Sequence, residues 1–129
     1  MIVEVETVIF RLMAILLALW SVSAFSGEIG VKQKAEIDHL FSFIDASPCE
    51  FSRNGKWYTA AKAGDHIKTK YQYLLVKGMI GSAEEFIELA ATKSSMSGKY
   101  YLVKCGSSTE IRSEDWLKQE LSSFRSVQQ

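Results

Sequence analysis

The segment CEFSRNGKWYT, residues 49–59, contains the pattern that decides the fold. Its centre, Asn54-Gly55, lies between two short runs that are rich in aromatic residues. Asn-Gly in this setting is typical of a two-residue β-hairpin turn, because both turn positions need positive φ. A turn of this length also fixes how the two strands pair: Arg53 with Lys56, Ser52 with Trp57, and Phe51 with Tyr58.

The alternation of side chains along a strand divides the hairpin into two faces. One face carries Cys49, Phe51 and Tyr58, and the other carries Ser52 and Trp57. We expect the first face to be buried, because Cys49 has to reach the only other cysteine of the chain. If no helix covers the second face, Trp57 and Tyr100 form an exposed aromatic patch, and such patches often mark binding sites.

Residues 12–25, LMAILLALWSVSAF, carry no charge and follow Arg11. The run ends close to Val22-Ser23-Ala24, whose small residues are typical of a signal-peptidase site. We therefore predict a signal peptide over residues 1–24 and a mature domain over residues 25–129. A membrane anchor is the alternative, but a spanning helix needs about 20 apolar residues and Arg11 interrupts the run before that length. After cleavage we expect no stable membrane anchor.

The chain is electrically balanced, with 15 basic and 15 acidic residues. Removal of residues 1–24 changes the balance little, since their only charged residues are Arg11, Glu4 and Glu6. Binding to nucleic acid normally requires a clearly basic face. We therefore do not expect a nucleic acid among the partners.

The two cysteines, Cys49 and Cys105, predict a disulfide, because export delivers them to an oxidising compartment. Closing so long a loop stabilises a fold by about 4 kcal/mol in the chain-entropy model. A metal site would need further ligands, and the two histidines, His39 and His66, show no spacing typical of one. We expect neither a metal nor a cofactor.

Helical periodicity appears on both sides of the hairpin. Apolar residues recur at helical spacing over residues 32–46, and Ser47-Pro48 ends that segment. Thr59 is a suitable N-cap for a second helix. The apolar stripe expected along this helix consists of Ala60, Ala63, Ile67, Tyr71, Leu74 and Gly78.

The second half of the chain predicts two further helices with a strand between them. Ser82 and Glu85 form a capping box in front of a short helix that buries Ala83, Phe86, Ile87 and Ala90. Residues 100–105 alternate as a strand, with Tyr101, Val103 and Cys105 on one face. Ser113 is expected to cap the last helix, which buries Leu117, Leu121 and Phe124.

These elements predict a small α+β domain. Its order is helix, hairpin, helix, helix, strand, helix, with an ordered core over about residues 34–125. We expect about four helices to cover one face of a short antiparallel sheet made of the hairpin and one strand.

The segment TKSSMSGK, residues 92–99, is rich in hydroxyl groups but fails each catalytic template. A P-loop would need glycine at the position of Lys93 and Ser or Thr at the position of Tyr100. Ser94 occupies the first glycine position of a G-x-S-x-G elbow, and Met96 replaces the serine of an S-x-x-K dyad. The pattern favours a turn in which serines end a helix and Gly98 supplies an unusual φ.

His66 lies at the border between the apolar stripe of its helix and solvent. Lys62 and Lys70, one turn away on either side, should lower its pKa, which suits a neutral base or a hydrogen-bond donor. A half-buried histidine that packs against the next element is the favoured interpretation.

Many spaced positions agree in order with the YfeK-like family of small exported bacterial proteins, a domain of unknown function. The matching positions are Phe51, Arg53-Asn54-Gly55, Tyr58, Ala60, Ala63, His66, Lys70, Ala83-Glu84, Phe86-Ile87, Ser94-Ser95, Ser97-Gly98-Lys99, Tyr101 and Val103. The chain resembles this family from about Glu36 to Arg125, and departs from it at Gly81-Ser82 and at Tyr100. The cysteine pair is not shared by every member. The resemblance implies a periplasmic location in a Gram-negative bacterium and no established activity.

The polar residues that match the family pattern favour a functional surface. Our leading hypothesis is a non-enzymatic binding or accessory protein of the cell envelope, whose partner is an envelope protein or a small ligand. The candidate binding residues are Arg53, His66, Lys70, Ser94, Ser95, Ser97 and Lys99. One alternative is a lysozyme inhibitor that uses a loop of the form Ser97-Gly98-x-x-Tyr101. The other is a small hydrolase in which His66 activates Ser95 or Ser97.

Overall fold

The computed structural model describes residues 29–129, and the predicted signal peptide, residues 1–24, lies outside them. The described part contains helices and strands in the expected order, with one additional strand. The elements are α2 (Val31–Ala46), β1 (Glu50–Arg53), β2 (Lys56–Thr59), α3 (Ala60–Val76), α4 (Ala83–Ala90), β3 (Leu102–Lys104), β4 (Ile111–Arg112) and α5 (Ser113–Val127).

The strands form one antiparallel sheet in the order β2-β1-β3-β4. The predicted hairpin register is confirmed, with Phe51 opposite Tyr58 and Arg53 opposite Lys56. Asn54 and Gly55 both have positive φ, 53° and 79°, as the two-residue turn requires. The strand β4 was not predicted, because a strand of two residues is too short to show any alternation.

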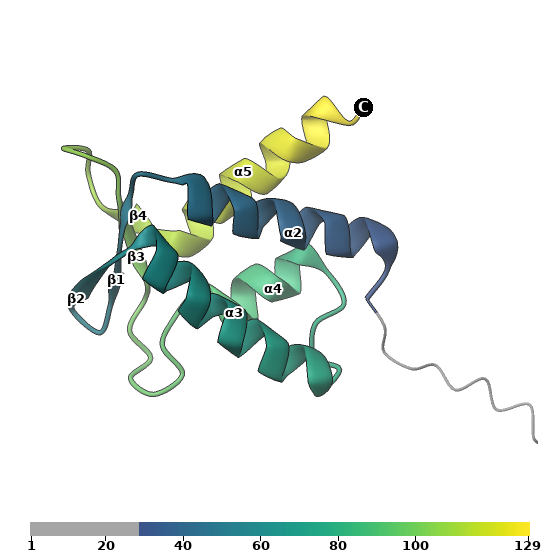
Figure 1. Ribbon diagram of the computed structural model, residues 1–129, viewed down its shortest axis with the longest axis horizontal. Helices are drawn as coiled ribbons and strands as arrows, with labels where there is room; N and C mark the ends of the chain where they lie inside the picture. Colours follow the sequence, from purple (N-terminus) through teal and green to yellow (C-terminus); the bar gives the residue numbers. More distant parts are fainter. Residues whose placement is uncertain (1–28) are drawn as a thin grey trace, which may run out of the picture.

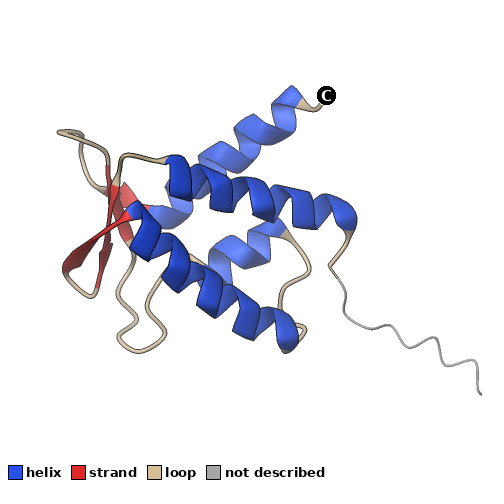
Figure 2. Ribbon diagram, viewed as in Figure 1, coloured by secondary structure: helices blue, strands red, loops and turns tan. Residues whose placement is uncertain are grey.

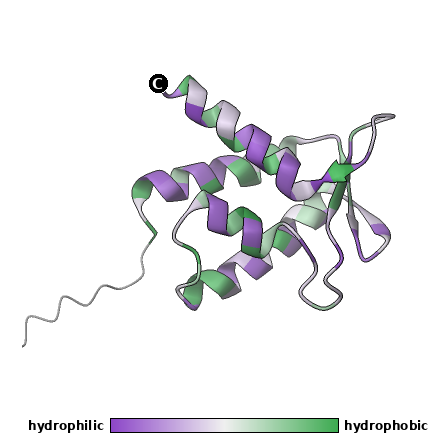
Figure 3. Cartoon of the chain, turned by 180° about the vertical axis from the view of Figure 1, so that it is seen from behind, coloured by the Kyte–Doolittle hydropathy of each residue, from purple (hydrophilic) through white to green (hydrophobic). Residues whose placement is uncertain are grey.

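The four helices of the described part all lie on one side of the sheet (Figure 1). Figure 2 shows the strands gathered at one end of the molecule, with the helices extending away from them. In Figure 3 hydrophobic and hydrophilic turns alternate along the helices, as expected of helices that bury one face. The α+β architecture predicted from the sequence is confirmed. The core between these layers includes Ile37, Leu40, Phe86, Ile87, Val103 and Leu117, each at most 1% exposed.

The disulfide between Cys49 and Cys105 is present, with the two Cα atoms 4.2 Å apart. It joins the segment after α2 to the end of β3. The bond therefore connects the first half of the domain to β3, one of the two central strands of the sheet.

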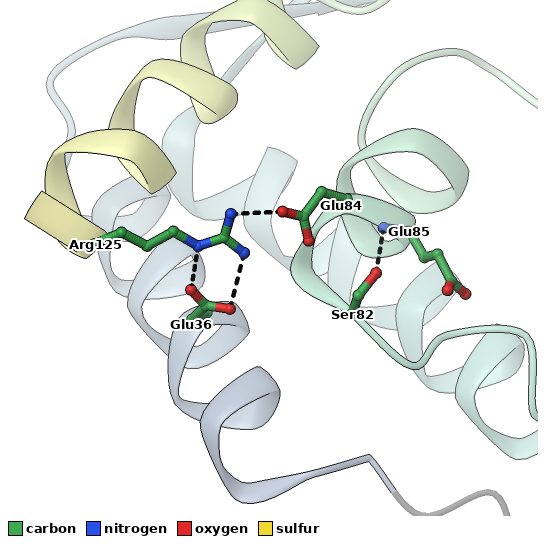
Figure 4. Close-up of polar contacts among 5 residues, drawn as sticks. All are labelled: Glu36, Ser82, Glu84, Glu85 and Arg125. Carbon is green, nitrogen blue, oxygen red and sulfur yellow. Dashed lines mark hydrogen bonds and ion pairs between the residues drawn. The ribbon is translucent and has the colours of Figure 1, made fainter.

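Two of the predicted helix caps are present. The Thr59 side chain accepts a hydrogen bond from Lys62 N at the start of α3. At the start of α4, the Ser82 hydroxyl accepts one from Glu85 N, as drawn in Figure 4, while the Glu85 carboxylate accepts one from Gly81 N.

Two details of the predicted helices were wrong. Ser113 does not cap α5: Arg112 stands at the N-cap, and Ser113 is the first helical residue. The preceding strand β4 continues directly into the helix, and Ser113 is buried, with 1% of its surface exposed. Gly78 does not belong to the apolar stripe of α3, because the helix ends at Val76 and Gly78 adopts φ +69° just beyond it.

Candidate functional site

A cavity of about 180 Å³ lies between the sheet, the first half of α3 and the start of α5. Arg53 reaches it because side chains alternate along β1, so that Arg53 and Phe51 share the face that the helices cover. Tyr101 directly precedes β3. Because Leu102 pairs with Ser52 in the antiparallel sheet, Tyr101 lies beside Arg53 and also lines the cavity. His66 comes from α3 and Ser113 from α5.

Two buried side-chain atoms of the cavity wall have no hydrogen-bond partner among residues 29–129: Arg53 Nε and Ser113 Oγ. A buried polar atom without a partner typically costs about 1–3 kcal/mol, and for that reason each one in a native protein requires an explanation. Both atoms can donate a hydrogen bond. The cavity therefore contains two donors that the fold itself does not use.

His66 and Tyr101 meet at the wall of the cavity. His66 Nε2 lies 3.4 Å from the Tyr101 hydroxyl, and the two rings are nearly perpendicular, at 82°. Burial lowers the pKa of His66 below its ordinary value of 6.5, and the charges of Arg53 and Lys70 lower it further. The direction agrees with the prediction, but burial is the largest cause, and of the two flanking lysines only Lys70 contributes.

Lys70 links the cavity wall to the serine-rich loop. Its Nζ donates to Lys93 O at 2.8 Å and lies 5.5 Å from the centroid of the Tyr101 ring. Burial, together with the charges of Arg53 and Lys93, lowers the pKa of Lys70. Positive charge therefore accumulates on this side of the domain. Among the described residues Arg53 forms no ion pair, and the only carboxylate on the cavity wall belongs to the exposed Asp65.

The serine-rich loop, residues 92–99, holds its own turn and does not line the cavity. Ser94 is 2% exposed, and its Oγ accepts hydrogen bonds from Met96 N at 3.3 Å and Ser97 N at 3.4 Å. Ser97 Oγ donates to Asn54 Oδ1 at 2.5 Å and accepts from Lys99 N at 3.2 Å. These bonds tie the loop to the hairpin turn.

Of the candidate binding residues, the structure brings Arg53 and His66 to one cavity, with Lys70 beside them. Ser95 and Lys99 are exposed on the loop, away from the cavity wall. Sequence reasoning missed Tyr101 and Ser113 as members of the site. The strand alternation, which predicts an inward-facing Tyr101, is the one available signal for that residue, whereas the sequence pattern at Ser113 predicts only a helix cap.

The outer face of the sheet carries the two aromatic residues expected there. Tyr100 is 43% exposed, and the Arg112 guanidinium lies 3.8 Å from the centroid of its ring. Lys104 Nζ lies 4.6 Å from the centroid of the Trp57 ring. Each aromatic ring is therefore partly covered by a cation from another segment of the sheet.

The arrangement supports binding better than covalent chemistry. No hydrogen bond joins His66 to a serine in the described part of the chain. The Ser94 hydroxyl is engaged within the loop, and the Ser97 hydroxyl donates to Asn54 of the hairpin turn. No group of three metal-ligating side chains occurs among residues 29–129. What the geometry offers is a small cavity with unused donors.

These features define a small disulfide-linked α+β domain with a largely apolar cavity between its sheet and its helices, whose wall carries two unpaired polar donors. The chain belongs to a family of unknown function, DUF5329, whose model matches residues 31–125. No curated protein and no solved structure matches the chain. Within residues 29–129 no helix is long and apolar enough to cross a membrane. The disulfide is compatible with an exported protein.

Proposed function

We propose that the protein is a non-enzymatic binding protein of the bacterial periplasm, of the YfeK-like type, and that its cavity takes a small ligand. The observation that carries this proposal is the pair of unpartnered donors, Arg53 Nε and Ser113 Oγ, on the wall of one cavity. Buried polar atoms of native proteins are normally paired, so two unpaired donors on one cavity wall call for a partner from outside the fold. The predicted signal peptide and the disulfide support the periplasmic location.

The serine-rich loop has a supporting role in this proposal. It holds Asn54 at the tip of the hairpin through Ser97, and it receives Lys70 at Lys93 O. Both contacts fix segments that border the cavity. Ser95 and Lys99, which are exposed, form the outer surface of the same region.

Cavity filling tests whether the cavity binds ligands. Ala63 lines the cavity, so Ala63→Leu should fill part of it, whereas Ala61→Leu makes the same change at an exposed position of α3. The probes are benzyl alcohol, benzamide, benzoate and benzylamine. Their binding is measured from shifts in the NMR signals of the backbone amides of isotopically labelled protein. At least one probe should shift the signals of Phe51, His66 and Tyr101 in the wild type and in Ala61→Leu, but not in Ala63→Leu. If no probe shifts these signals in the wild type, the cavity is not a binding site.

The periplasmic location has its own test. The protein should be released from cells by osmotic shock, and its N-terminus should lie close to residue 25. Retention in the cytoplasm with residues 1–24 still attached would contradict the proposed location.

No observation favours either alternative function. Tyr101, the tyrosine of the inhibitor-like loop, is 5% exposed, so its ring does not protrude toward a partner. His66 is in contact with Tyr101 and not with a serine.

A further inference from the structure

We propose that the ligand is a small monocarboxylate with an apolar body, held by Arg53 and Ser113. This inference rests on the proposed binding function and names the chemical class of the ligand. It is carried by the charge of the cavity wall, by the two unused donors and by the size of the cavity.

The charge of the wall selects an anion. Arg53 contributes a guanidinium whose Nε–H is buried and unpaired. Lys62, on the α3 side of the wall, is exposed, so Arg53 is the cation that a ligand in the cavity meets at close range. The opposing carboxylate, Asp65, is exposed. A cationic ligand would meet like charges without a buried counter-ion, which is unfavourable in a partly desolvated cavity.

The donors fit a carboxylate. The Nε–H and one terminal N–H of a guanidinium form a fork that can hold both oxygens of one carboxylate. Ser113, 1% exposed, adds a hydroxyl donor from a different element. Ser113 is also the first residue of α5, and the N-terminus of a helix favours negative charge. Glu114, the next residue, counters this effect only in part, because it forms ion pairs with Arg112 and Lys118.

The apolar part of the cavity wall and the volume of the cavity indicate the size and character of the ligand's uncharged part. Phe51, Tyr58 and Ile67 present apolar surface to the cavity. Its volume of about 180 Å³ is slightly larger than the roughly 150 Å³ of an apolar protein cavity that binds benzene. The body of the ligand is therefore about the size of one aromatic ring. A doubly charged phosphate suits the site less well, since burial of a second charge would require a second close cation.

Three probes separate the components of this inference: benzoate, its neutral analogue benzamide, and inorganic phosphate. Binding is followed by the Arg53 Nε–H signal and the Ser113 amide signal of the labelled protein. Benzoate should shift both signals and should bind about tenfold more tightly than benzamide, because a hydrogen bond to a charged group contributes about 1.5–3 kcal/mol. Phosphate should bind more weakly than benzoate.

Matched variants test the two donors. Arg53→Met should weaken benzoate binding about tenfold or more. Lys104→Met removes one positive charge from the outer face of the sheet, where Lys104 lies over the Trp57 ring, and should leave the affinity unchanged. Ser113→Ala should weaken benzoate binding several-fold. If Arg53→Met does not fold, Arg53→Lys replaces it, because lysine keeps the charge but lacks the Nε–H donor and should still weaken binding.

The outcomes distinguish this inference from the proposed function. Equal affinity for benzoate and benzamide, with no effect of the Arg53 variant, would overturn the anion inference and leave the binding function intact. Phosphate that binds as tightly as benzoate would overturn the monocarboxylate class alone. If none of these probes binds, and neither do the neutral benzyl alcohol and the cationic benzylamine used to test the proposed function, both proposals are overturned.

Discussion

Arg125, close to the end of α5, binds both carboxylate oxygens of Glu36 in the second turn of α2 (Figure 4). Arg125 Nε lies 2.5 Å from Glu36 Oε2, and Arg125 Nη2 lies 3.0 Å from Glu36 Oε1. The same guanidinium donates to Glu84 of α4 at 2.6 Å. One side chain thus connects three helices that are distant in sequence. Glu36 is 2% exposed and depends on Arg125 for its partners.

Loss of Arg125 should destabilise the fold. We expect Arg125→Ala to lower the free energy of unfolding by about 2 kcal/mol or more, because the buried Glu36 carboxylate would lose its partner. Chemical denaturation of the variant and of the wild type measures this difference in the free energy of unfolding. Lys118→Ala, which removes an exposed partner of Glu114, should cost at most about 0.5 kcal/mol. Equal costs for the two variants would mean that the Glu36 contact contributes no more than a surface pair.

The same contact predicts a loss of stability in acid. The hydrogen bond from Arg125 holds the pKa of Glu36 below its ordinary value of 4.5. A lowered pKa in the folded state contributes stability that is fully present above pH 4.5 and is lost as the pH falls through the folded-state pKa. Denaturation of wild type and Glu36→Gln between pH 6 and pH 3 should therefore show a steeper decline for the wild type. Parallel curves would contradict this assignment.

Reduction of the disulfide should weaken the domain without removing the cavity. The bond spans a sequence separation of 56 residues, and a loop of that length corresponds to about 4 kcal/mol in the chain-entropy model. We expect the Cys49→Ala, Cys105→Ala double variant to lose up to that amount in chemical denaturation. Where it remains folded, its cavity signals should match those of the wild type. A loss of binding in a folded double variant would indicate that the bond also shapes the cavity.

His66 should make stability depend on pH near neutrality. Its folded-state pKa is lowered by burial and by Arg53 and Lys70, while Lys62, Asp65 and Tyr101 also border the same cavity. The unfolded chain therefore takes up the proton first, and stability should decline as the pH falls below 6.5. Lys70→Met should raise the pKa of His66 toward its ordinary value in an NMR titration. Lys77→Met, at the far end of α3, should not change it.

The serine-rich loop should respond differently at its buried and exposed serines. Ser94→Ala removes an acceptor of two backbone hydrogen bonds and should cost about 1–2 kcal/mol of unfolding free energy. Ser95→Ala, at an exposed position, should stay within about 0.5 kcal/mol of the wild type. Benzoate affinity should be unchanged in Ser95→Ala. A large loss of affinity in that variant would show that the loop contacts the ligand directly.

Short-range patterns explain why much of the fold was predictable. The Asn54-Gly55 turn set the register of the hairpin, and the capping residues Thr59 and Ser82 marked the starts of two helices. Strand alternation placed Tyr101 and Val103 inward, where they are 5% and 1% exposed. For the turn and the caps the interacting groups lie within a few residues of one another, and for the strand the alternation itself is a local pattern, so the sequence contains the necessary information.

The sequence by itself determined the class of fold, the hairpin and the pairing of its two cysteines, because a two-residue turn and a single cysteine pair leave one arrangement each. Only the tertiary structure decided the cavity. Arg53, His66, Tyr101 and Ser113 come from four separate segments, and their meeting depends on how α3 and α5 pack against the sheet. The Ser113 hydroxyl changed from an expected cap to an unpaired donor because the two-residue strand β4 runs directly into α5. No local pattern encodes that junction, since the pairing of β4 with β3 that fixes it is a contact of the folded chain.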